Sequence, residues 1–396
     1  MRSLGNYDVV IVGAGPVGAV AARSAARHGA RVLLVERGET PTYPNRCTGI
    51  ISPRCLKESE LGHEVVLREI KGGRIHAPNG RLLQIEAKDT RAVVIDRCLF
   101  NFKLLEMAKE AGTEFITKSR VTGLDNQWVM VERGGCLYRA QTKVIIGADG
   151  AKSQVANWAK LPPPGQFLLG LQATSRYEPE RPDFIEVFFD QNLAPGFFAW
   201  VVPAEEGIAR VGLATNRMKH ASALLKRLLQ KLNLKPMKVN AGLIPIGPRT
   251  RTTTDRVMVV GDAAAQAKPT SGGGLFTGIV AAKIAGQVAA DCVLTHYSNV
   301  ALTTYETRWR EKLGRELSIG MSLRRLFGHL RNNEFNFIFT ILDNKTIRDV
   351  ISTHGDIDYP SLIIKALFQQ PKQWRKIWKG LNGKLASASP PLKPAI

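Results

Sequence analysis

The sequence predicts an α/β fold: a Rossmann-like dinucleotide-binding domain interleaved with an antiparallel-sheet domain, plus a helical C-terminal part. Three observations predict it. The chain opens with a strand–helix–strand pattern around a glycine-rich turn, short alternating segments follow the proline run near residue 163, and a buried strand ending in Gly261-Asp262 comes after them. Segments typical of a dinucleotide-binding domain lie on both sides of the segments with alternating polar and apolar residues. The chain therefore leaves its first domain and later returns to it.

The first domain is predicted from apolar and helical runs near the N-terminus. Tyr7–Val12 and Arg31–Glu36 are short apolar segments, and the Ala-rich segment Pro16–His28 between them has helical character. This order is typical of a parallel α/β domain. Arg97–Ala111 has the spacing of an amphipathic helix, and Val257–Val260 that of a buried strand. We expect this domain to comprise residues 1–60, 91–160 and 250–298.

The second domain follows a change of composition at Leu161–Pro164. In it we expect a helix over Ala221–Leu232 and a returning strand over Val239–Ile246, after which the chain returns to the first domain with a long Ala-rich helix from about Gly274 to Leu294. Four other segments are predicted as strands of one sheet: Leu168–Tyr177, Phe184–Phe189, Phe198–Val202 and Ala209–Thr215. The second domain is expected to comprise residues 61–90 and 161–249. A separate C-terminal part, mainly helical and with a loose tail, is expected over residues 299–396.

The chain is strongly basic. Fifty-five Lys and Arg residues against 34 Asp and Glu residues give a net charge of +21 and a pI near 10. Such a surface attracts polyanions, although a lineage with generally basic proteins is an alternative explanation. No helix-turn-helix, RNA-recognition or zinc-finger signature accompanies the charge, so we expect no nucleic-acid partner.

The cysteines exclude several kinds of site. The five of them are scattered and form no CxxC pair, which argues against a disulfide framework, a structural zinc site or an iron–sulfur cluster, and we expect no metal. The first strand leaves no room for a signal peptide, and no apolar run approaches the ~20 residues of a membrane span. We therefore expect a cytoplasmic protein, peripheral on the inner face of the cell membrane if it meets one.

A glycine-rich motif, Gly13-Ala14-Gly15-Pro16-Val17-Gly18, follows the first strand and opens the first helix. Gly13 permits a tight turn, Gly15 lets the backbone approach a pyrophosphate, and Gly18 lets helix and strand pack closely. Glu36, followed by Arg37, ends the second strand, where a carboxylate can accept hydrogen bonds from ribose hydroxyls. A glycine turn chosen for packing alone does not explain Glu36, so the motif predicts dinucleotide binding.

Three later signatures resemble the aromatic-hydroxylase-type FAD superfamily. They are Gly261-Asp262-Ala263-Ala264, Gly147-Ala148-Asp149-Gly150 with Ser153, and Arg97 in Ile95-Asp96-Arg97. The resemblance implies an FAD cofactor, with Asp262 reaching the ribityl chain, Arg97 lying near the FAD and the Asp149 motif supporting its binding. The same resemblance assigns Gly261 and Val121 to the cofactor site.

A second glycine-rich segment, Pro269 to Leu275, precedes the long Ala-rich helix. Gly273, Gly274 and Leu275 would bring backbone N–H groups and the positive end of a helix dipole close to a flat ligand. Packing of the glycines is the alternative. We expect this segment to contact the flavin.

Three blocks resemble a narrower group, the geranylgeranyl reductase family. They are Pro44-Asn45-Arg46-Cys47-Thr48-Gly49, the stretch from Pro195 to Gly212 with Phe198 and Trp200, and the segment 262–274. The resemblance covers roughly residues 5–295 and implies that Arg46, Cys47 and Thr48 lie beside the flavin. Ala204 stands where a lysine is common, and Ala265-Gln266 replaces a usual Arg-Leu pair.

The family resemblance implies hydrogenation of C=C bonds in geranylgeranyl or polyprenyl chains, carried by a membrane lipid or a prenyl diphosphate. An isolated alkene accepts hydride only if a weak acid delivers a proton, and Cys47 is the candidate acid. A small buried hydrophobe is its alternative role. Phe198 and Trp200 would wall a prenyl tunnel or belong to ordinary sheet core. NAD(P)H, a ferredoxin or a deazaflavin would donate electrons.

Two other functions fit the same scaffold: an FAD-dependent monooxygenase or halogenase, and a quinone-linked electron-transfer flavoprotein. The segment 198–203 lacks the first Trp of the halogenase pattern, and the chain lacks the cluster cysteines of the quinone-linked class. The basic, aromatic runs Leu323–Phe327 and Trp374–Lys379 are typical of helices in a lipid headgroup layer or of amphipathic helices packed on their own domain.

Overall fold

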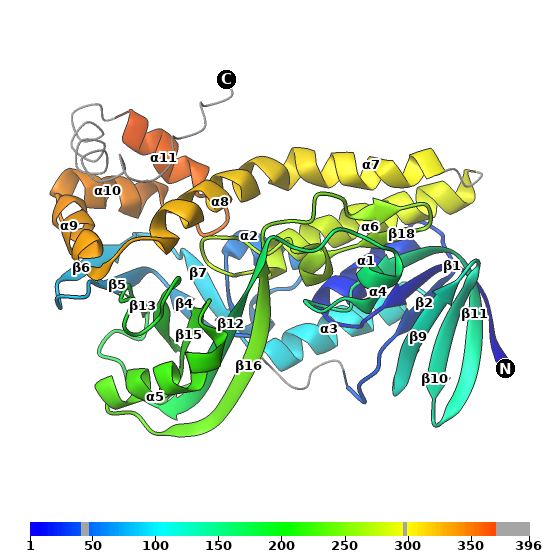
Figure 1. Cartoon of the computed structure of the whole chain (residues 1–396), viewed down its shortest axis with the longest axis horizontal. Coiled ribbons are helices and arrows are strands. Elements are labelled where there is room, and N and C mark those ends of the chain that lie inside the picture. The colour runs from blue at the N-terminus through cyan, green and yellow to red at the C-terminus, as the bar shows by residue number, and fades with distance from the viewer. Residues whose placement is uncertain (41–46, 296–298, 370–396) are drawn as a thin grey trace.

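The computed structural model describes residues 1–40, 47–295 and 299–369, and three β-sheets occur within these ranges. The molecule is elongated, with an eight-stranded sheet toward one end and a seven-stranded sheet toward the other (Figure 1). The expected α/β fold class is confirmed.

The eight-stranded sheet is built around β1 (Arg2–Val12), which pairs in parallel with β11 (Cys136–Gly147) and β2 (Val32–Val35). Its other strands are β8 (Glu114–Ile116), β9 (Ser119–Asp125), β10 (Trp128–Arg133), β17 (Thr253–Thr254) and β18 (Val257–Val259). Helices α1 (Pro16–Arg27), α3 (Arg97–Glu110) and α6 (Leu275–Leu294) share the main hydrophobic core with this sheet. The short helix α4 (Gln154–Trp158) packs in a second core on the opposite face.

The seven-stranded sheet has the order β16-β12-β15-β14-β13-β5-β6 and is antiparallel except where β13 meets β5. Its strands are β5 (Gly72–His76), β6 (Leu82–Glu86), β12 (Gln166–Arg176), β13 (Phe184–Phe188), β14 (Ala199–Pro203), β15 (Ile208–Thr215) and β16 (Pro236–Ile246). Side chains alternate between its faces. Val201 and Val211 pack with helix α5 (Ala221–Lys231), whereas Trp200 and Val202 pack on the opposite face.

A small sheet of β3 (Ile50–Ile51), β7 (Ala92–Ile95) and β4 (Val66–Ile70) links the two ends of the molecule. Val93 and Ile95 of β7 enter the main core, and Val94 packs in the cluster that contains Val202 of the larger sheet. Helix α2 (Pro53–Ser59) and a single 3-10 turn at His63–Val65 complete this region. Strand β7 therefore connects the hydrophobic cores of the two large sheets.

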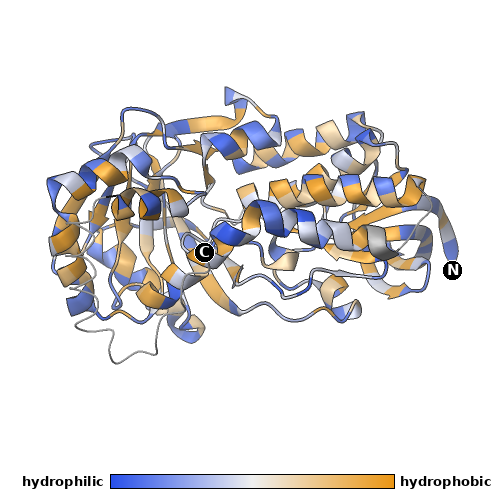
Figure 2. Cartoon of the chain, turned by 90° about the horizontal axis from the view of Figure 1, so that it is seen from above, coloured by the Kyte–Doolittle hydropathy of each residue, from blue (hydrophilic) through white to orange (hydrophobic). Residues whose placement is uncertain are grey.

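The C-terminal part is helical. Helix α7 (Asn299–Trp309) continues through a π-helical turn at Arg310–Gly314 into α8 (Arg315–Gly328), and α9 (Asn332–Leu342), α10 (Lys345–His354) and α11 (Ser361–Phe368) follow. The fully buried Trp309 donates its indole N–H to the Thr252 hydroxyl at 3.0 Å. The outer helices carry hydrophobic and hydrophilic residues side by side, as amphipathic helices do (Figure 2).

The expectation about membrane-length segments is wrong for α6. Its 20 residues make it long and apolar enough to cross a membrane, the single such helix among the described residues. However, 72% of its apolar window is buried, and a Cβ placed on Gly286 would lie 2.5 Å from the Ala21 carbonyl oxygen of α1. This close packing explains the composition of α6 as that of a core helix.

The predicted elements lie close to the observed ones, and β1 shows the largest extension because it begins at Arg2 rather than Tyr7. The seven-stranded sheet takes its strands from residues 72–86 and 166–246. We propose that the two domains and the C-terminal part have the residue bounds that the sequence predicts.

Candidate functional site

The first glycine-rich loop is shaped by two close backbone contacts. Gly13 has φ +99°, and a Cβ on it would lie 2.5 Å from the Ala148 carbonyl oxygen. A Cβ on Gly18 would lie 1.9 Å from the Gly13 carbonyl oxygen. By contrast, a Cβ on Gly15 would meet no protein atom within 4 Å. Gly15, which precedes Pro16 at the start of α1, is therefore the position where a ligand can approach the backbone.

The carboxylate of Glu36 holds this loop in place. It accepts hydrogen bonds from the backbone N–H groups of Ala14 and Gly38, both at 2.8 Å. A carboxylate has about four lone-pair sites, so these two bonds leave capacity for a ribose hydroxyl. Arg37, the next residue, is exposed.

Asp262 lies where β18 ends, as the sequence predicts. The preceding Gly261 has φ +62°, and a Cβ on it would lie 3.1 Å from the Val17 side chain. A Cβ on Gly274, the N-cap residue of α6, would lie 2.8 Å from Asp262 Oδ1. The second glycine-rich segment therefore packs directly over the Asp262 carboxylate.

The pKa of Asp262 is raised to about 6 by burial, and the nearby charge of Arg97 acts in the opposite direction. An unfolded Asp titrates near pH ~3.9, so the folded state binds this proton more tightly than the unfolded state between roughly pH 4 and 6. Flavin-free protein should therefore lose stability through Asp262 as the pH rises across this window. Thermal unfolding at several pH values should show that Asp262→Asn becomes more stable relative to the wild type as the pH rises across this window. A difference in Tm that does not change with pH would contradict the raised pKa of Asp262.

Arg97 lies at the start of α3 and is 9% exposed. Its Nη1 donates to Asn101 Oδ1 at 2.5 Å, while its Nε is buried without a hydrogen-bond partner among the described residues. Its side chain also reaches the Cys47–Gly49 segment, because a Cβ on Gly49 would lie 3.4 Å from Arg97 Cγ. Arg97 therefore stands between Asp262 and that segment.

The Cys47–Gly49 segment is held by the seven-stranded sheet. The half-buried Cys47 accepts a hydrogen bond from Gly49 N–H at 3.3 Å, and Thr48 Oγ1 donates to Gln172 Oε1 at 2.7 Å. Arg210 Nη1 donates to the Thr48 carbonyl oxygen at 2.6 Å and to the Ile95 carbonyl oxygen at 3.3 Å. Arg46 lies outside the described residues.

Arg210 and Gln172 were missed by the sequence reasoning. Both are 7% exposed. Arg210 stands on β15, whose other members are mostly buried, and Gln172 stands between the buried Leu171 and Ala173 on β12. A charged or amide side chain inside a buried strand is costly unless it is paired, and this is the signal that would have found them.

Phe198 and Trp200 come together on the face of the seven-stranded sheet that Gln172 and Arg210 share. Phe198 stacks on Phe197 with ring centroids 4.3 Å apart and meets Trp200 edge-on at 6.0 Å. Trp200 crosses Gly212 of β15, where a Cβ would lie 2.7 Å from the indole ring. The aromatic contacts continue to Phe189, 5.8 Å from Phe198, so an apolar path runs from the site toward α9.

Other predicted positions surround the first loop. The Asp149 carboxylate accepts from Ser153 Oγ at 2.6 Å and from two backbone N–H groups of α4, and its Cα would lie 3.1 Å from a Cβ on Gly13. Val121 is buried in β9, whose first residue donates to the Glu36 carbonyl oxygen. Gly273 and Leu275 flank Gly274 at the N-terminus of α6.

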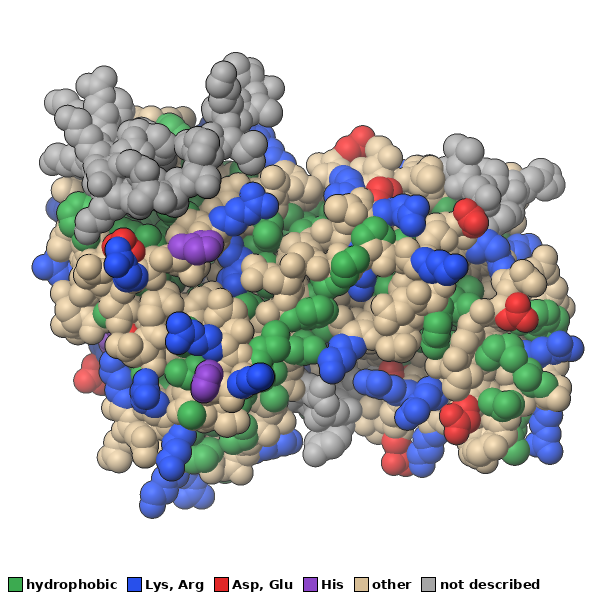
Figure 3. Space-filling view, in the orientation of Figure 1, with side chains coloured by type: hydrophobic (Ala, Val, Ile, Leu, Met, Phe, Trp, Pro, Cys, Tyr) green, Lys and Arg blue, Asp and Glu red, His purple; other side chains and the backbone are tan. Residues whose placement is uncertain are grey.

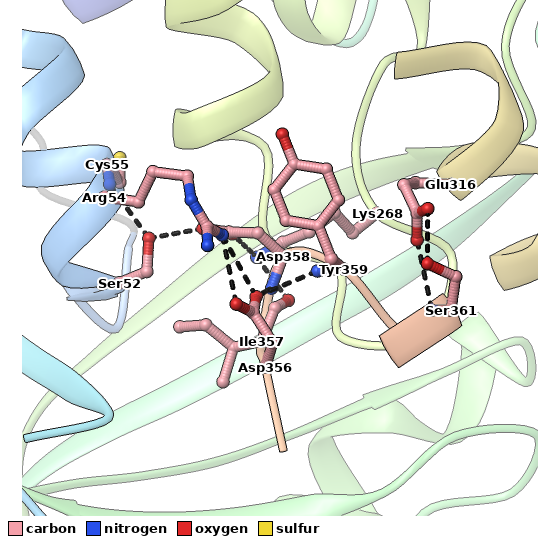
Figure 4. A network of polar contacts seen from close by, with 10 residues as sticks. All are labelled: Ser52, Arg54, Cys55, Lys268, Glu316, Asp356, Ile357, Asp358, Tyr359 and Ser361. Carbon is pink, nitrogen blue, oxygen red and sulfur yellow. Dashed lines mark hydrogen bonds and ion pairs between the residues drawn. The ribbon is translucent and has the colours of Figure 1, made fainter. Parts of the chain in front are cut away.

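A polar network, here called the C-terminal clamp, joins Ser52, Lys268 and Asp358 (Figure 4). Asp358 is 3% exposed and accepts from Lys268 Nζ at 2.6 Å and from the Ser52 hydroxyl. Ser52 follows the Cys47 segment, and Lys268 precedes the second glycine-rich segment. The clamp therefore ties both to the C-terminal part, and no local sequence pattern reveals contacts between residues 306 positions apart.

Comparison with known proteins shows the family to which the chain belongs. A family model described as lycopene cyclase protein matches residues 8–350. A digeranylgeranylglycerophospholipid reductase from Methanothrix thermoacetophila is 31% identical over 360 residues, which cover 86% of this chain and 92% of that protein.

Solved structures share the fold. A geranylgeranyl bacteriochlorophyll reductase-like protein from Thermoplasma acidophilum superposes with a TM-score of 0.84 at 24% identity, covering 95% of this chain and 99% of that one. A p-nitrophenol 4-monooxygenase from Pseudomonas putida has a TM-score of 0.69 at 16% identity, covering 89% and 97%. The fold is thus shared by reductases and monooxygenases of the flavoprotein type. The chain belongs to the geranylgeranyl reductase family, together with the digeranylgeranylglycerophospholipid reductases.

Proposed function

We propose that the protein is an FAD-dependent reductase that hydrogenates C=C bonds of geranylgeranyl or polyprenyl chains, carried by an archaeal-type ether lipid or a prenyl diphosphate. The observation that carries the proposal is the position of Cys47. Hydrogen bonds of Thr48 and Arg210 hold its segment on the face of the seven-stranded sheet that carries Trp200, and Arg97 contacts Gly49 of the same segment. The family relationship supports the same activity.

The chain's own residues fit FAD. Gly15 offers an open backbone to a pyrophosphate, Glu36 has lone pairs left for a ribose, and Asp262 lies beneath Gly274. The Nε of Arg97 is a buried donor that a ligand oxygen would satisfy. FAD, when bound, supplies hydride from flavin N5.

Cys47 would deliver the proton that an isolated alkene requires. Its bond from Gly49 N–H uses a lone pair of the sulfur, so this contact does not consume the S–H proton. Phe198 and Trp200 would exclude water and hold the prenyl chain against the site. Proton and hydride would then reach the two carbons of one double bond.

An anaerobic assay tests the function. Dithionite-reduced protein should convert a geranylgeranyl lipid to products that gain two hydrogens per reduced bond, read by mass spectrometry. Dithionite stands in for the physiological donor, which we propose to be NAD(P)H, a ferredoxin or a deazaflavin. A monooxygenase would stop working without oxygen, and no mass gain with several prenyl substrates would refute the reductase.

We propose further that an anionic membrane meets the face formed by α5 and the start of β16. Between Glu206 and Asp255 the sequence has no acidic residue, and seven exposed cations lie between residues 217 and 238 of this stretch: Arg217, Lys219, Lys226, Arg227, Lys231, Lys235 and Lys238. One of them, Lys226, lines an apolar groove of about 390 Å³ together with Leu225, Leu229 and others. Blue side chains gather in this region, at the lower left of Figure 3.

This surface predicts salt-sensitive membrane binding. At low salt the protein should float with vesicles containing anionic lipid, and binding should fall as salt rises. Changing Lys226 and Lys235 to Gln should weaken flotation several-fold, whereas the same change at the exposed Lys152 and Lys160 should not. Equal loss in both double variants would point to net charge rather than to this face.

A further inference from the structure

Arg324 is turned into the protein from helix α8. The inward side of α8 carries Leu317, Gly320 and Arg324, which follow one another at helical spacing and are all buried. Gly320 packs on the loop before α6, since a Cβ on it would lie 3.0 Å from Pro269 Cδ. Arg324, one turn further along, takes a place where an apolar residue would be expected.

The charge of Arg324 pairs with no carboxylate among the described residues. The side chain is 8% exposed, its Nε has no hydrogen-bond partner among the described residues, and burial lowers its pKa. The other buried arginines in the described part of the chain donate hydrogen bonds to protein groups: Arg23, Arg97, Arg210 and Arg249. The undescribed residues contain no Asp or Glu side chain, so the sequence holds no further acidic residue to pair with Arg324.

Arg324 also lies close to the candidate site. Its Cζ is 5.2 Å from the centroid of the Phe197 ring, which stacks on Phe198. The tip of the Phe197 ring also contacts the second glycine-rich segment, because a Cβ on Gly272 would lie 3.6 Å from Phe197 Cζ. The guanidinium and that segment therefore lie against the same phenyl ring.

We propose that Arg324 binds a phosphate group of the substrate. This inference rests on the proposed function and names the group that the site recognises besides the prenyl chain. Burying an unpaired charge is costly, and a guanidinium matches two oxygens of a phosphate with two parallel hydrogen bonds. The phosphate could belong to a glycerolipid headgroup or to a prenyl diphosphate. Anchoring it beside Phe197 fixes where the apolar chain begins to cross the aromatic face.

Arg324→Met tests the proposal, with Arg325→Met at the exposed neighbour as the matched control. Steady-state reduction is measured with geranylgeranyl diphosphate, a phosphate-bearing digeranylgeranylglycerol lipid and neutral geranylgeraniol. Arg324→Met should raise KM at least tenfold for a phosphate-bearing substrate and leave geranylgeraniol unchanged, and Arg325→Met should change neither. The substrate that responds identifies the source of the phosphate. Equal effects on all three substrates, or on none, would overturn the proposal.

Thermal unfolding separates this inference from the proposed function. Inorganic pyrophosphate should raise the Tm of the flavin-loaded wild type and not that of Arg324→Met. Without the ligand, Arg324→Met should unfold at an equal or higher temperature, because it removes an unpaired buried charge. If the protein reduces geranylgeraniol but pyrophosphate does not change the Tm, the phosphate site is refuted and the reductase activity is supported. If pyrophosphate raises the Tm but no prenyl substrate is reduced, the reductase activity is refuted and the phosphate site is supported.

Discussion

Replacing Cys47 with alanine is expected to lower the rate of prenyl-chain reduction by about 100-fold or more, the usual contribution of a positioned general acid. The loss should fall on kcat, because the methyl side chain still fills the space beside Gly49 but cannot supply a proton. Flavin binding and the rate of flavin reduction by dithionite should not change. Single-turnover reduction of geranylgeraniol, with the flavin spectrum followed at the same time, measures both.

The matched control is Cys98→Ala, because Cys98 is exposed near the start of α3. This variant should keep wild-type turnover. Cys47→Ser should recover part of the activity at most, since a hydroxyl is a weaker acid than a thiol. Unchanged turnover in Cys47→Ala would return this residue to the role of a small packing side chain.

Alanine substitutions three residues apart in the first glycine-rich loop are expected to fail in different ways. Gly15→Ala places its Cβ in open space, so the flavin-free protein should keep its Tm while FAD affinity falls at least about tenfold, or roughly 1.4 kcal/mol. Gly18→Ala places its Cβ 1.9 Å from a carbonyl oxygen. Overpacking of this kind costs about 1–3 kcal/mol, so Gly18→Ala should lower the Tm even without flavin.

Calorimetry of stripped protein and flavin titration of each variant distinguish the two effects. Each variant serves as the control of the other, because the chemical change is identical and only the surroundings of the added methyl group differ. Equal FAD affinity in Gly15→Ala and the wild type would show that no ligand approaches this backbone position.

The elements of the fold could be predicted because their signals are local. Tyr7–Val12, Arg97–Ala111 and Val257–Val260 each carry an apolar pattern that neighbouring residues alone define, and each lies within an observed element or overlaps it closely. The membrane-length expectation failed for α6 because Lys283, Gln287 and Asp291 interrupt its apolar run, although the helix as a whole is long and apolar enough to cross a membrane. Small residues of this helix, such as Gly286, allow its tight contact with α1.

The candidate site was predictable only in part. Gly13, Glu36 and Asp262 belong to motifs whose spacing encodes their role, whereas Arg210 and Lys268 act through contacts with residues far away in the chain. One departure from the family pattern also gains an explanation. Gln266 accepts from Gly261 N–H at 2.8 Å and donates to Tyr305 of α7, so it fixes the turn before Asp262.

The run Leu323–Phe327 shows what a charge pattern alone does not decide. The sequence leaves open whether its cations lie in a lipid headgroup layer or on an amphipathic helix packed on its own domain, and in the structure Arg324 is buried while Arg325 is exposed. The inward side of α8 packs on its own domain. The second run, Trp374–Lys379, lies outside the described residues. Adjacent residues on a helix point about 100° apart, so one of two neighbouring arginines can face the core.

The C-terminal clamp links the order of synthesis to the order of assembly. Asp358 is synthesised 306 residues after Ser52, yet it holds Ser52 and Lys268 on both sides of the site. A nascent chain still on the ribosome therefore has its glycine-rich loops before it has the carboxylate that joins them. Closing contacts across such sequence distances is slow compared with local folding. We expect flavin uptake to begin only after Asp358 has left the ribosome.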